Sequence, residues 1–243
     1  MNELAAPNAE HRSEKVQRLR VRFARGPEAA EIGHLDLARC WERAFCEAGI
    51  AVSYSQGNRP QPRIAIAAGL PMGVTSEGEL LDVIVAERTD PAQLAERVQP
   101  HLPPGLAVRE VREVGMGLPS LSSAVRWADY EVDVPAGDVR DAAAAIEPFL
   151  AAESFHWLDT RGEKTREYDL RALVQELRVG GAGDGVVRLS MRLRCDAAGV
   201  GRPDQVVKAL GLLQATRIHR VRLVLAEASP AREAWRRRGR FLQ

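Results

Sequence analysis

The sequence predicts an α+β fold made of two tandem ferredoxin-like (split βαβ) domains with antiparallel sheets. Two observations support this class. The hydrophobic pattern gives the order strand, helix, strand, strand, helix, strand twice, which is the order of the split βαβ motif. A chain of 243 residues with 45% hydrophobic content can form two small cores. We therefore expect domains at residues 15–114 and 129–228, a linker at 115–128, a disordered tail at 1–14 and a basic tail at 229–243.

The first domain begins with a strand at Val16–Phe23, where apolar residues alternate with arginines. The helix that follows, Asp36–Ala48, has an apolar stripe at helical spacing and stops before Gly49. Asp90 caps a second predicted helix, Pro91–Leu102. The other predicted strands are Ile50–Tyr54, Arg63–Ala68, Leu80–Glu87 and Leu106–Val114.

The second domain repeats this order of elements without clear sequence similarity to the first. Predicted helices cover Gly137–Ala152 and Pro203–Leu212. The predicted strands are Tyr130–Val134, Val186–Arg194 and Ile218–Ala226, and we expect extended or mixed structure at Phe155–Thr160 and Glu167–Val179.

Composition limits the classes of function. A net charge of +1 excludes a strongly polybasic protein. Nearly all basic residues are arginines, which bind phosphate or carboxylate through two parallel hydrogen bonds. A GC-rich genome would produce the same bias. The lysines are Lys15, Lys164 and Lys208.

The three cysteines, Cys40, Cys46 and Cys195, have neither C-x3-C-x2-C nor C-x2-C spacing. We therefore expect no iron–sulfur cluster, metal or other cofactor in this chain. An odd cysteine count without an apolar leader predicts reduced thiols in the cytoplasm. No apolar run is long enough for a membrane span, so we expect no membrane partner.

The most unusual segment is Tyr54–Asp82, YSQGNRPQPRIAIAAGLPMGVTSEGELLD, which places glycines and prolines around two apolar runs. Glycine permits positive φ, whereas proline fixes φ and removes a donor. The runs Ile64–Ala68 and Leu80–Val85 can pair as strands. We therefore expect an ordered loop–strand–turn–strand unit that carries the function of the first domain.

Together with GHLDLARCWERAF (Gly33–Phe45), this segment resembles the bacterial radical SAM-linked family, a domain of unknown function found alone or fused to B12-binding-type radical SAM proteins. The match is good over Arg18–Arg126 and looser beyond. The chain departs from the family pattern at Gly33, where the family has serine, at Asn58-Arg59, where it has a phenylalanine-containing pair, and at Gln61, where it has histidine. The resemblance implies a radical SAM protein as partner. Family genes tend to lie beside ribonuclease and ribosomal-protein genes, which favours RNA as substrate.

His34 and Asp36, at the start of the first helix, are the candidate catalytic residues. His34 precedes a helix near the Gly/Pro-rich loop, where it could act as a general base or contact a phosphate. Asp36 equally suits a helix-capping role.

The loop supplies candidate substrate-binding residues, since backbone amides in such loops bind anions and arginines bind phosphate. No G-x4-G-K-[ST] motif is present, so nucleotide hydrolysis is not indicated. A rigid turn with solvated arginines is the alternative. The candidates are Tyr54, Ser55, Gln56, Gly57, Arg59 and Arg63.

Arginines alternate along several strands, and we expect them to line the open faces of the sheets and to bind RNA phosphates. The same strands supply almost no aromatic residues, which argues against stacking on bases. A solvated charged face is the alternative. These arginines are Arg18, Arg20 and Arg22 in the first domain, and Arg188, Arg192, Arg194, Arg220 and Arg222 in the second.

Two further groups of polar residues have weaker patterns. Glu77, Glu79 and Asp82 could bind metal or transfer protons, but Glu79 and Asp82 are expected to face opposite sides of a strand. Asp169, Arg171 and His219 could converge if their strands are neighbours.

The leading hypothesis is an accessory or substrate-binding partner of a radical SAM enzyme in RNA modification or metabolism, without catalytic activity of its own. One alternative is a metal-independent RNA enzyme, either an endoribonuclease with His34 as base or a pseudouridine-synthase-like protein that needs an aspartate in a cleft, such as Asp36 or Asp169. The other alternative is a protein-interaction scaffold.

Overall fold

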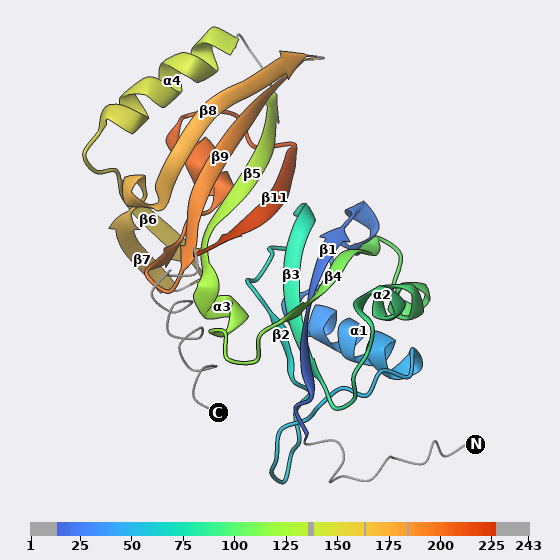
Figure 1. The fold of residues 1–243 in the computed structure, drawn as a ribbon. Coiled ribbons are helices and arrows are strands. Elements are labelled where there is room, and N and C mark those ends of the chain that lie inside the picture. Colours follow the sequence, from blue (N-terminus) through green and yellow to red (C-terminus); the bar gives the residue numbers. More distant parts are fainter. Residues whose placement is uncertain (1–13, 136–138, 163, 184, 227–243) are drawn as a thin grey trace, which may run out of the picture.

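One mixed, mostly antiparallel sheet of nine strands organises the residues that the computed structural model describes, 14–135, 139–162, 164–183 and 185–226 (Figure 1). Few helices accompany it, and a separate two-stranded hairpin packs beside it. The strands follow each other in the order β10-β9-β5-β11-β3-β1-β4, with β2 also paired to β3 and β8 also paired to β9.

The amino-terminal half arranges its strands in the order β4-β1-β3-β2. Its core contains Phe23, Trp41 and Phe45, with the ring centroids of Phe23 and Trp41 5.0 Å apart. Helix α2 begins where expected, because Asp90 accepts hydrogen bonds from two amides of the first turn. The elements are β1 (Gln17–Arg25), η2 (Pro27–Ala29), α1 (His34–Glu47), β2 (Ile64–Ile66), β3 (Thr75–Val85), α2 (Pro91–Val98), η3 (Gln99–His101) and β4 (Leu106–Val114).

The carboxy-terminal half arranges its strands in the order β11-β5-β9-β8. Tyr130, Val132 and Val134 of β5 belong to its core, whereas the acidic residues between them lie on the opposite face. The elements are α3 (Leu121–Ala124), β5 (Val125–Pro135), α4 (Val139–Ala151), β6 (His156–Arg161), β7 (Lys164–Asp169), η4 (Arg171–Leu173), β8 (Val174–Gly183), β9 (Val186–Asp196), β10 (Gly199–Val200), α5 (Pro203–Ala209) and β11 (Arg217–Leu225).

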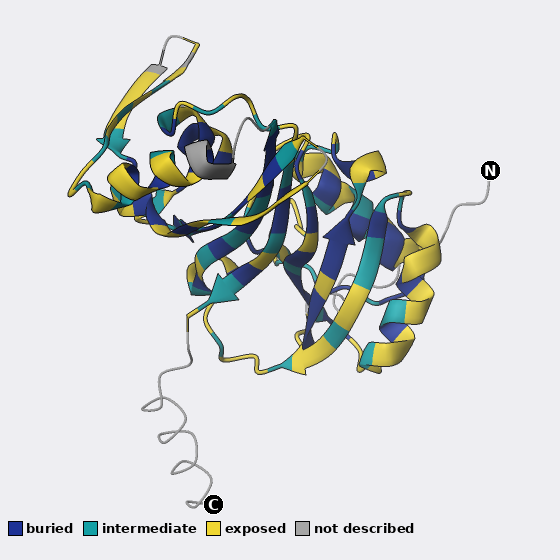
Figure 2. Ribbon diagram, turned by 90° about the horizontal axis from the view of Figure 1, so that it is seen from above, coloured by how far each residue is buried: buried dark blue, intermediate teal, exposed yellow. Residues whose placement is uncertain are grey.

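The two halves share one sheet, although two separate antiparallel sheets were expected. Strands β3 and β11 pair in parallel at two positions, His219 with Thr75 and Arg220 with Ser76. We call this junction the seam. Figure 2 shows buried residues concentrated in the strands on either side of it and on the inner faces of the helices.

One local prediction needs correction. The predicted strand Ile50–Tyr54 makes only single bridges, Val52 with Val85 and Tyr54 with Pro62. The predicted linker 115–128 contains α3 and the start of β5, and buried Leu121 and Val125 anchor it in the second core. Residues 1–13 of the predicted tail and all of the basic tail 229–243 lie outside the described residues.

Candidate functional site at the seam

A close approach of two backbones defines the seam. A Cβ atom on Gly78 would lie 2.4 Å from the carbonyl oxygen of Val221 and 2.7 Å from the Cα of Arg222. No side chain fits at those distances, so glycine is required where β3 passes β11. The Ser76 hydroxyl strengthens the junction by donating to the Arg220 carbonyl at 2.7 Å.

Arg220 fastens the seam from the interior. Its guanidinium pairs with Glu79, the Nε–Oε1 distance being 2.7 Å, and both side chains are 1% exposed. It also donates to the carbonyls of Gly69 and Ala68. Burial alone would lower the pKa of Arg220, but the Glu79 carboxylate outweighs this effect and raises it above its ordinary value.

Arg25 holds the adjacent part of the Gly/Pro-rich segment. It is 1% exposed and donates to the carbonyls of Ala29, Ala30, Leu70 and Pro71. Two buried arginines therefore bind four successive carbonyls, from Ala68 to Pro71. We call this stretch, Ala68–Pro71, the strap. Its carbonyls bind arginine side chains rather than a neighbouring strand, which explains its irregular backbone.

Beside the seam lies a cavity of about 570 Å³ lined by both halves. The end of β1 and the starts of β3, β4 and β11 form its walls. The backbone amide of Gly26 donates to the carbonyl of Gly105 at 2.7 Å and closes one side. Gly105 has φ +85°, and a Cβ there would lie 2.6 Å from the Ala29 amide nitrogen. The polar residues that line the cavity are Arg25, Thr75, Ser76, Glu77, Arg109, Thr216, Arg217 and His219.

His219 is a buried histidine that lines this cavity. It is 8% exposed, and its Nδ1 forms a 2.8 Å hydrogen bond with the Thr75 hydroxyl. Its Nε2 lies 4.0 Å from the exposed carboxylate of Glu77. Burial first, and the charge of Arg217 second, lower the pKa of His219 below its ordinary value. At neutral pH the imidazole is therefore uncharged and can accept or donate one hydrogen bond.

Two exposed arginines stand at the cavity, one from each half. Arg109 of β4 has no ion-pair partner within the described ranges. Arg217 lies 3.4 Å from Asp133, whose carboxylate is held more closely by Arg188 at 2.7 Å. That hydrogen bond from Arg188 is the main reason that the pKa of Asp133 is lowered. The cavity thus presents two exposed arginines and one exposed carboxylate, Glu77, around the hydrogen-bonding groups of Thr75, Ser76 and His219, and the two arginines can bind an anionic ligand.

Comparison with known proteins identifies the family. A family model described as an uncharacterized protein conserved in bacteria (DUF2344) matches residues 18–203. The chain belongs to this family. No curated protein matches it.

Solved structures similar to this DUF2344 chain include a Cbf5–Nop10–Gar1 complex, at 10% identity and TM-score 0.44 over 89% of this chain and 51% of that one. An archaeal box H/ACA sRNP Nop10–Cbf5 complex matches at 11% identity and TM-score 0.42, over 92% and 52%. An H/ACA RNP bound to a substrate RNA containing 2′-deoxyuridine matches at 10% identity and TM-score 0.41, over 90% and 50%. The chain spans about half the length of these proteins, and the likeness is too distant to bear on function.

The predicted catalytic residues do not line the cavity. In the DUF2344 chain, His34 and Asp36 are exposed at the start of α1, where Asp36 accepts a 3.0 Å hydrogen bond from Arg39. Neither residue lines the seam cavity. Tyr54, at the base of the loop, contacts the opposite part of the same helix, donating to Glu42 at 3.0 Å.

The Tyr54–Pro62 loop is a hairpin extension with an exposed tip. Ser55 and Gln61 exchange hydrogen bonds across it, and Arg63 donates to the Tyr54 carbonyl at 3.3 Å. Gly57 has φ +122°, which explains the glycine at the turn. Gln56 and Arg59 are exposed at the tip.

Arg18 and Arg20 do not line an open face. They are 7% and 6% exposed, and both guanidiniums bind the buried carboxylate of Asp82. Arg18 also donates to the carbonyls of Leu118 and Pro119, because the connection between β4 and α3 crosses this face of the sheet. Of the three predicted arginines of β1, only Arg22 is exposed, and it pairs with Glu110 at 3.3 Å.

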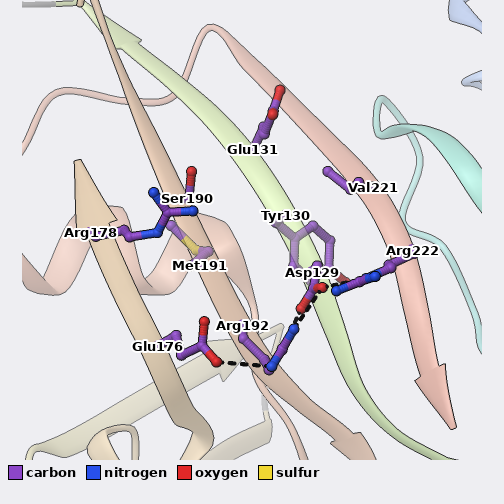
Figure 3. Close-up of a pocket in the computed structure, with 10 residues that line it drawn as sticks. All are labelled: Asp129, Tyr130, Glu131, Glu176, Arg178, Ser190, Met191, Arg192, Val221 and Arg222. Carbon is purple, nitrogen blue, oxygen red and sulfur yellow. Dashed lines mark hydrogen bonds and ion pairs between the residues drawn. The ribbon is translucent and has the colours of Figure 1, made fainter. Parts of the chain in front are cut away.

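The open face of the second half is a lattice of ion pairs around a hollow of about 280 Å³ (Figure 3). Asp129 lies at its centre, between Arg192 at 2.6 Å and Arg222 at 2.7 Å. Burial alone would raise the pKa of Asp129, but the hydrogen bonds and charges of these two arginines together outweigh it and lower the pKa below its ordinary value. Arg188 and Arg194 pair with Asp133 and Asp196, so the predicted row of free arginines is largely neutralised. Arg220, predicted on the same face, is buried instead.

The remaining predicted clusters separate. Asp169 accepts hydrogen bonds from the amides of Phe155 and Arg171, just before β8. His219 lies near the start of β11, where it forms a hydrogen bond with Thr75 instead. The three acidic residues of β3 also separate. Glu77 lines the cavity, Glu79 binds Arg220, and Asp82 binds Arg18 and Arg20. Within the described residues, no group of three or more His, Cys, Asp or Glu side chains could hold a metal ion. None of the described helices has both the length and the apolar character needed to cross a bilayer.

Proposed function

We propose that this protein is a substrate-binding accessory protein that recognises phosphate groups of RNA in the seam cavity and works with a radical SAM enzyme. The supporting observation is the composition of the cavity. Arg109 and Arg217 stand at its rim, and uncharged His219 with Thr75 lies inside. A guanidinium on each side and a neutral hydrogen-bonding group between them suit a phosphodiester.

The position of the cavity supports binding rather than packing. Ligand sites form preferentially between structural units, where both sides contribute polar groups to a concave surface. We take residues 15–114 and 129–228 as two ferredoxin-like units joined by 115–128. The strand orders β4-β1-β3-β2 and β11-β5-β9-β8 support this assignment. The cavity then lies between the units, with the Ala68–Pro71 strap holding them in place.

The radical SAM partner is proposed from the sequence resemblance carried by Gly33–Phe45 and Tyr54–Asp82. In such a pairing the cofactor enzyme supplies the radical chemistry, and this chain binds and orients the substrate. Exposed His34 and the Gln56–Arg59 tip, which do not line the cavity, are assigned to a second part of the substrate-binding surface. Because they are exposed, His34→Ala and Arg59→Ala should weaken binding without changing thermal stability.

A metal-independent RNA enzyme is the second candidate, and His219 is the observation that favours it. A histidine with a lowered pKa inside a cavity is uncharged at neutral pH and can act as a general base. Incubation of RNA with this protein alone in the presence of EDTA separates the two functions. Cleavage or modification that disappears in His219→Gln would favour the enzyme.

The binding proposal is tested by fluorescence anisotropy with single-stranded RNA over a range of salt concentrations. Arg109→Gln/Arg217→Gln should weaken binding and flatten the slope of log K against log salt by about 0.7 per lost phosphate contact. The control is Arg39→Gln/Arg88→Gln, which removes the same charge from two exposed positions. Equal loss in both double variants would show that the cavity is not the site. Co-purification from the native host tests the partner, and recovery without a radical SAM protein would contradict that part.

A further inference from the structure

Strand β4 forms one end of the sheet and has an unpaired edge. Among the described residues it pairs with β1 alone (Figure 1). On its other side, the Gln99 side chain binds the Leu106 carbonyl and the Val108 amide, but only at the beginning of the strand. The rest of β4 offers backbone donors and acceptors to another strand.

The sequence of this edge is complementary to itself. Residues 108–114 read Val-Arg-Glu-Val-Arg-Glu-Val. When two copies run antiparallel with Val111 opposite Val111, Glu110 faces Arg112, Arg109 faces Glu113, and Val108 faces Val114. Opposite charges and apolar pairs stabilise directly facing positions in an antiparallel ladder. Moving the register by one residue in either direction brings like charges together.

Arg112 lacks a counter-charge within its own chain. Its neighbour on β1 is Arg20, whose guanidinium binds Asp82. Arg112 is exposed and has no ion pair with any described residue. Within the part of the chain that the structure describes, Glu110 pairs only with Arg22, at 3.3 Å, and both side chains are about half exposed. A second copy would supply a carboxylate to Arg112 and an additional guanidinium to Glu110.

We propose that this protein forms a homodimer through antiparallel pairing of two β4 edges about Val111, which joins two nine-stranded sheets. Charged residues on an edge strand normally discourage pairing with other strands. A charge pattern that is its own complement discourages unrelated strands but accepts a second copy. The bulge at Arg109 limits the regular ladder to its centre, Glu110–Arg112, so the charge pairs that decide the pairing are those between Glu110 and Arg112.

The test uses charge reversal on the exposed residues Glu110 and Arg112. In Glu110→Arg two arginines face each other at each symmetric position, and in Arg112→Glu two glutamates do so. Sedimentation velocity should therefore show a concentration-dependent dimer for the wild type and monomers for each variant. An equimolar mixture of the two variants should dimerise again, because each pairs with the other through opposite charges. The double variant Glu110→Arg/Arg112→Glu should also dimerise.

A wild-type protein that stays monomeric up to its solubility limit would overturn the proposal. So would a dimer that persists in both single variants, because it would use a different surface. Circular dichroism and thermal melting show whether each variant is folded. Failure of the mixture to associate while the wild type dimerises would rule out this register.

Discussion

Arg220 of β11 and Glu79 of β3, which are 141 positions apart in the sequence, form a buried ion pair in which each side chain is 1% exposed. Their positions on opposite strands of the seam make this pair the interior link between the two halves. Two carbonyls of the Gly/Pro-rich segment complete the coordination of the guanidinium. Protein groups therefore compensate the charge of the buried guanidinium.

The first prediction is that Arg220→Met destabilises the protein by about 3–5 kcal/mol, because the Glu79 carboxylate is left buried without a counter-charge. Urea unfolding provides the measurement. Arg222→Met, two residues along the same strand, removes an ion pair from a largely exposed arginine and should cost less than about 1 kcal/mol. Similar losses for both variants would contradict a special role for the buried pair.

The second prediction concerns Gly78. Gly78→Ala places a methyl group 2.4 Å from the Val221 carbonyl oxygen, so a backbone must move and the seam must open. We expect the free energy of unfolding to fall by about 1–3 kcal/mol, the usual range for overpacking. In the matched control, Gly181→Ala on β8, the methyl group has no atom within 4 Å. The idea fails if the two variants unfold at the same urea concentration.

The order of elements was predictable because it depends on local periodicity. Arg18–Phe23 alternates and lies within β1, and Leu106–Val114 becomes β4 without change. The union of the two sheets was not predictable, because β3 and β11 pair at only two positions. The hydrophobic pattern of a sequence does not predict so small a number of paired positions between two distant segments.

The site was predicted only in part. The segment containing His219 was noticed, but its partners were sought at Asp169 and Arg171 rather than at Thr75. Alternation placed Arg18 and Arg20 on the side of the sheet away from the helices, and it could not show that residues 115–120 cross that side. The sequence did contain one signal, Asp82. It lies on β3 on the same side of the sheet as Arg18 and Arg20, and a carboxylate beside two arginines predicts a buried ion pair.

The third prediction concerns pH. Burial lowers the pKa of His219 below the ordinary value of 6.5, so the unfolded chain binds a proton more readily than the folded protein. Stability should therefore fall as the pH falls through 6.5 and rise again as the pH increases. His219→Gln should reduce this dependence, measured by urea unfolding at a series of pH values. His34→Gln, which replaces an exposed histidine, is the control. An unchanged pH profile in His219→Gln would show that His219 does not contribute.

The fourth prediction is selective reaction of the thiols. Cys195 is 7% exposed, and burial raises its pKa, which keeps the unreactive thiol form. Cys46 is exposed on α1. Iodoacetamide should label Cys46 in the native protein and Cys195 only after unfolding in urea, as read by peptide mass spectrometry. Native labelling of Cys195 at the rate of Cys46 would show that the second core opens.

The fifth prediction separates a structural arginine from a surface arginine on neighbouring strands. Arg20 and Arg112 face each other across β1 and β4, but Arg20 is 6% exposed and bound to Asp82, whereas Arg112 is exposed. Arg20→Gln should cost about 3–5 kcal/mol, reduced to the extent that Arg18 still compensates Asp82. Arg112→Gln should change the free energy of unfolding by less than about 0.5 kcal/mol.

RNA binding gives the second measurement for this pair. Because Arg20 is covered, any loss of affinity in Arg20→Gln should follow its loss of folded protein and disappear at temperatures where the variant is fully folded. Binding measured well below the melting temperature of the variant makes that distinction. A folded Arg20→Gln protein with weaker binding and a reduced salt slope would restore β1 as part of an RNA-binding surface, and would mean that the 115–120 segment moves aside when RNA binds.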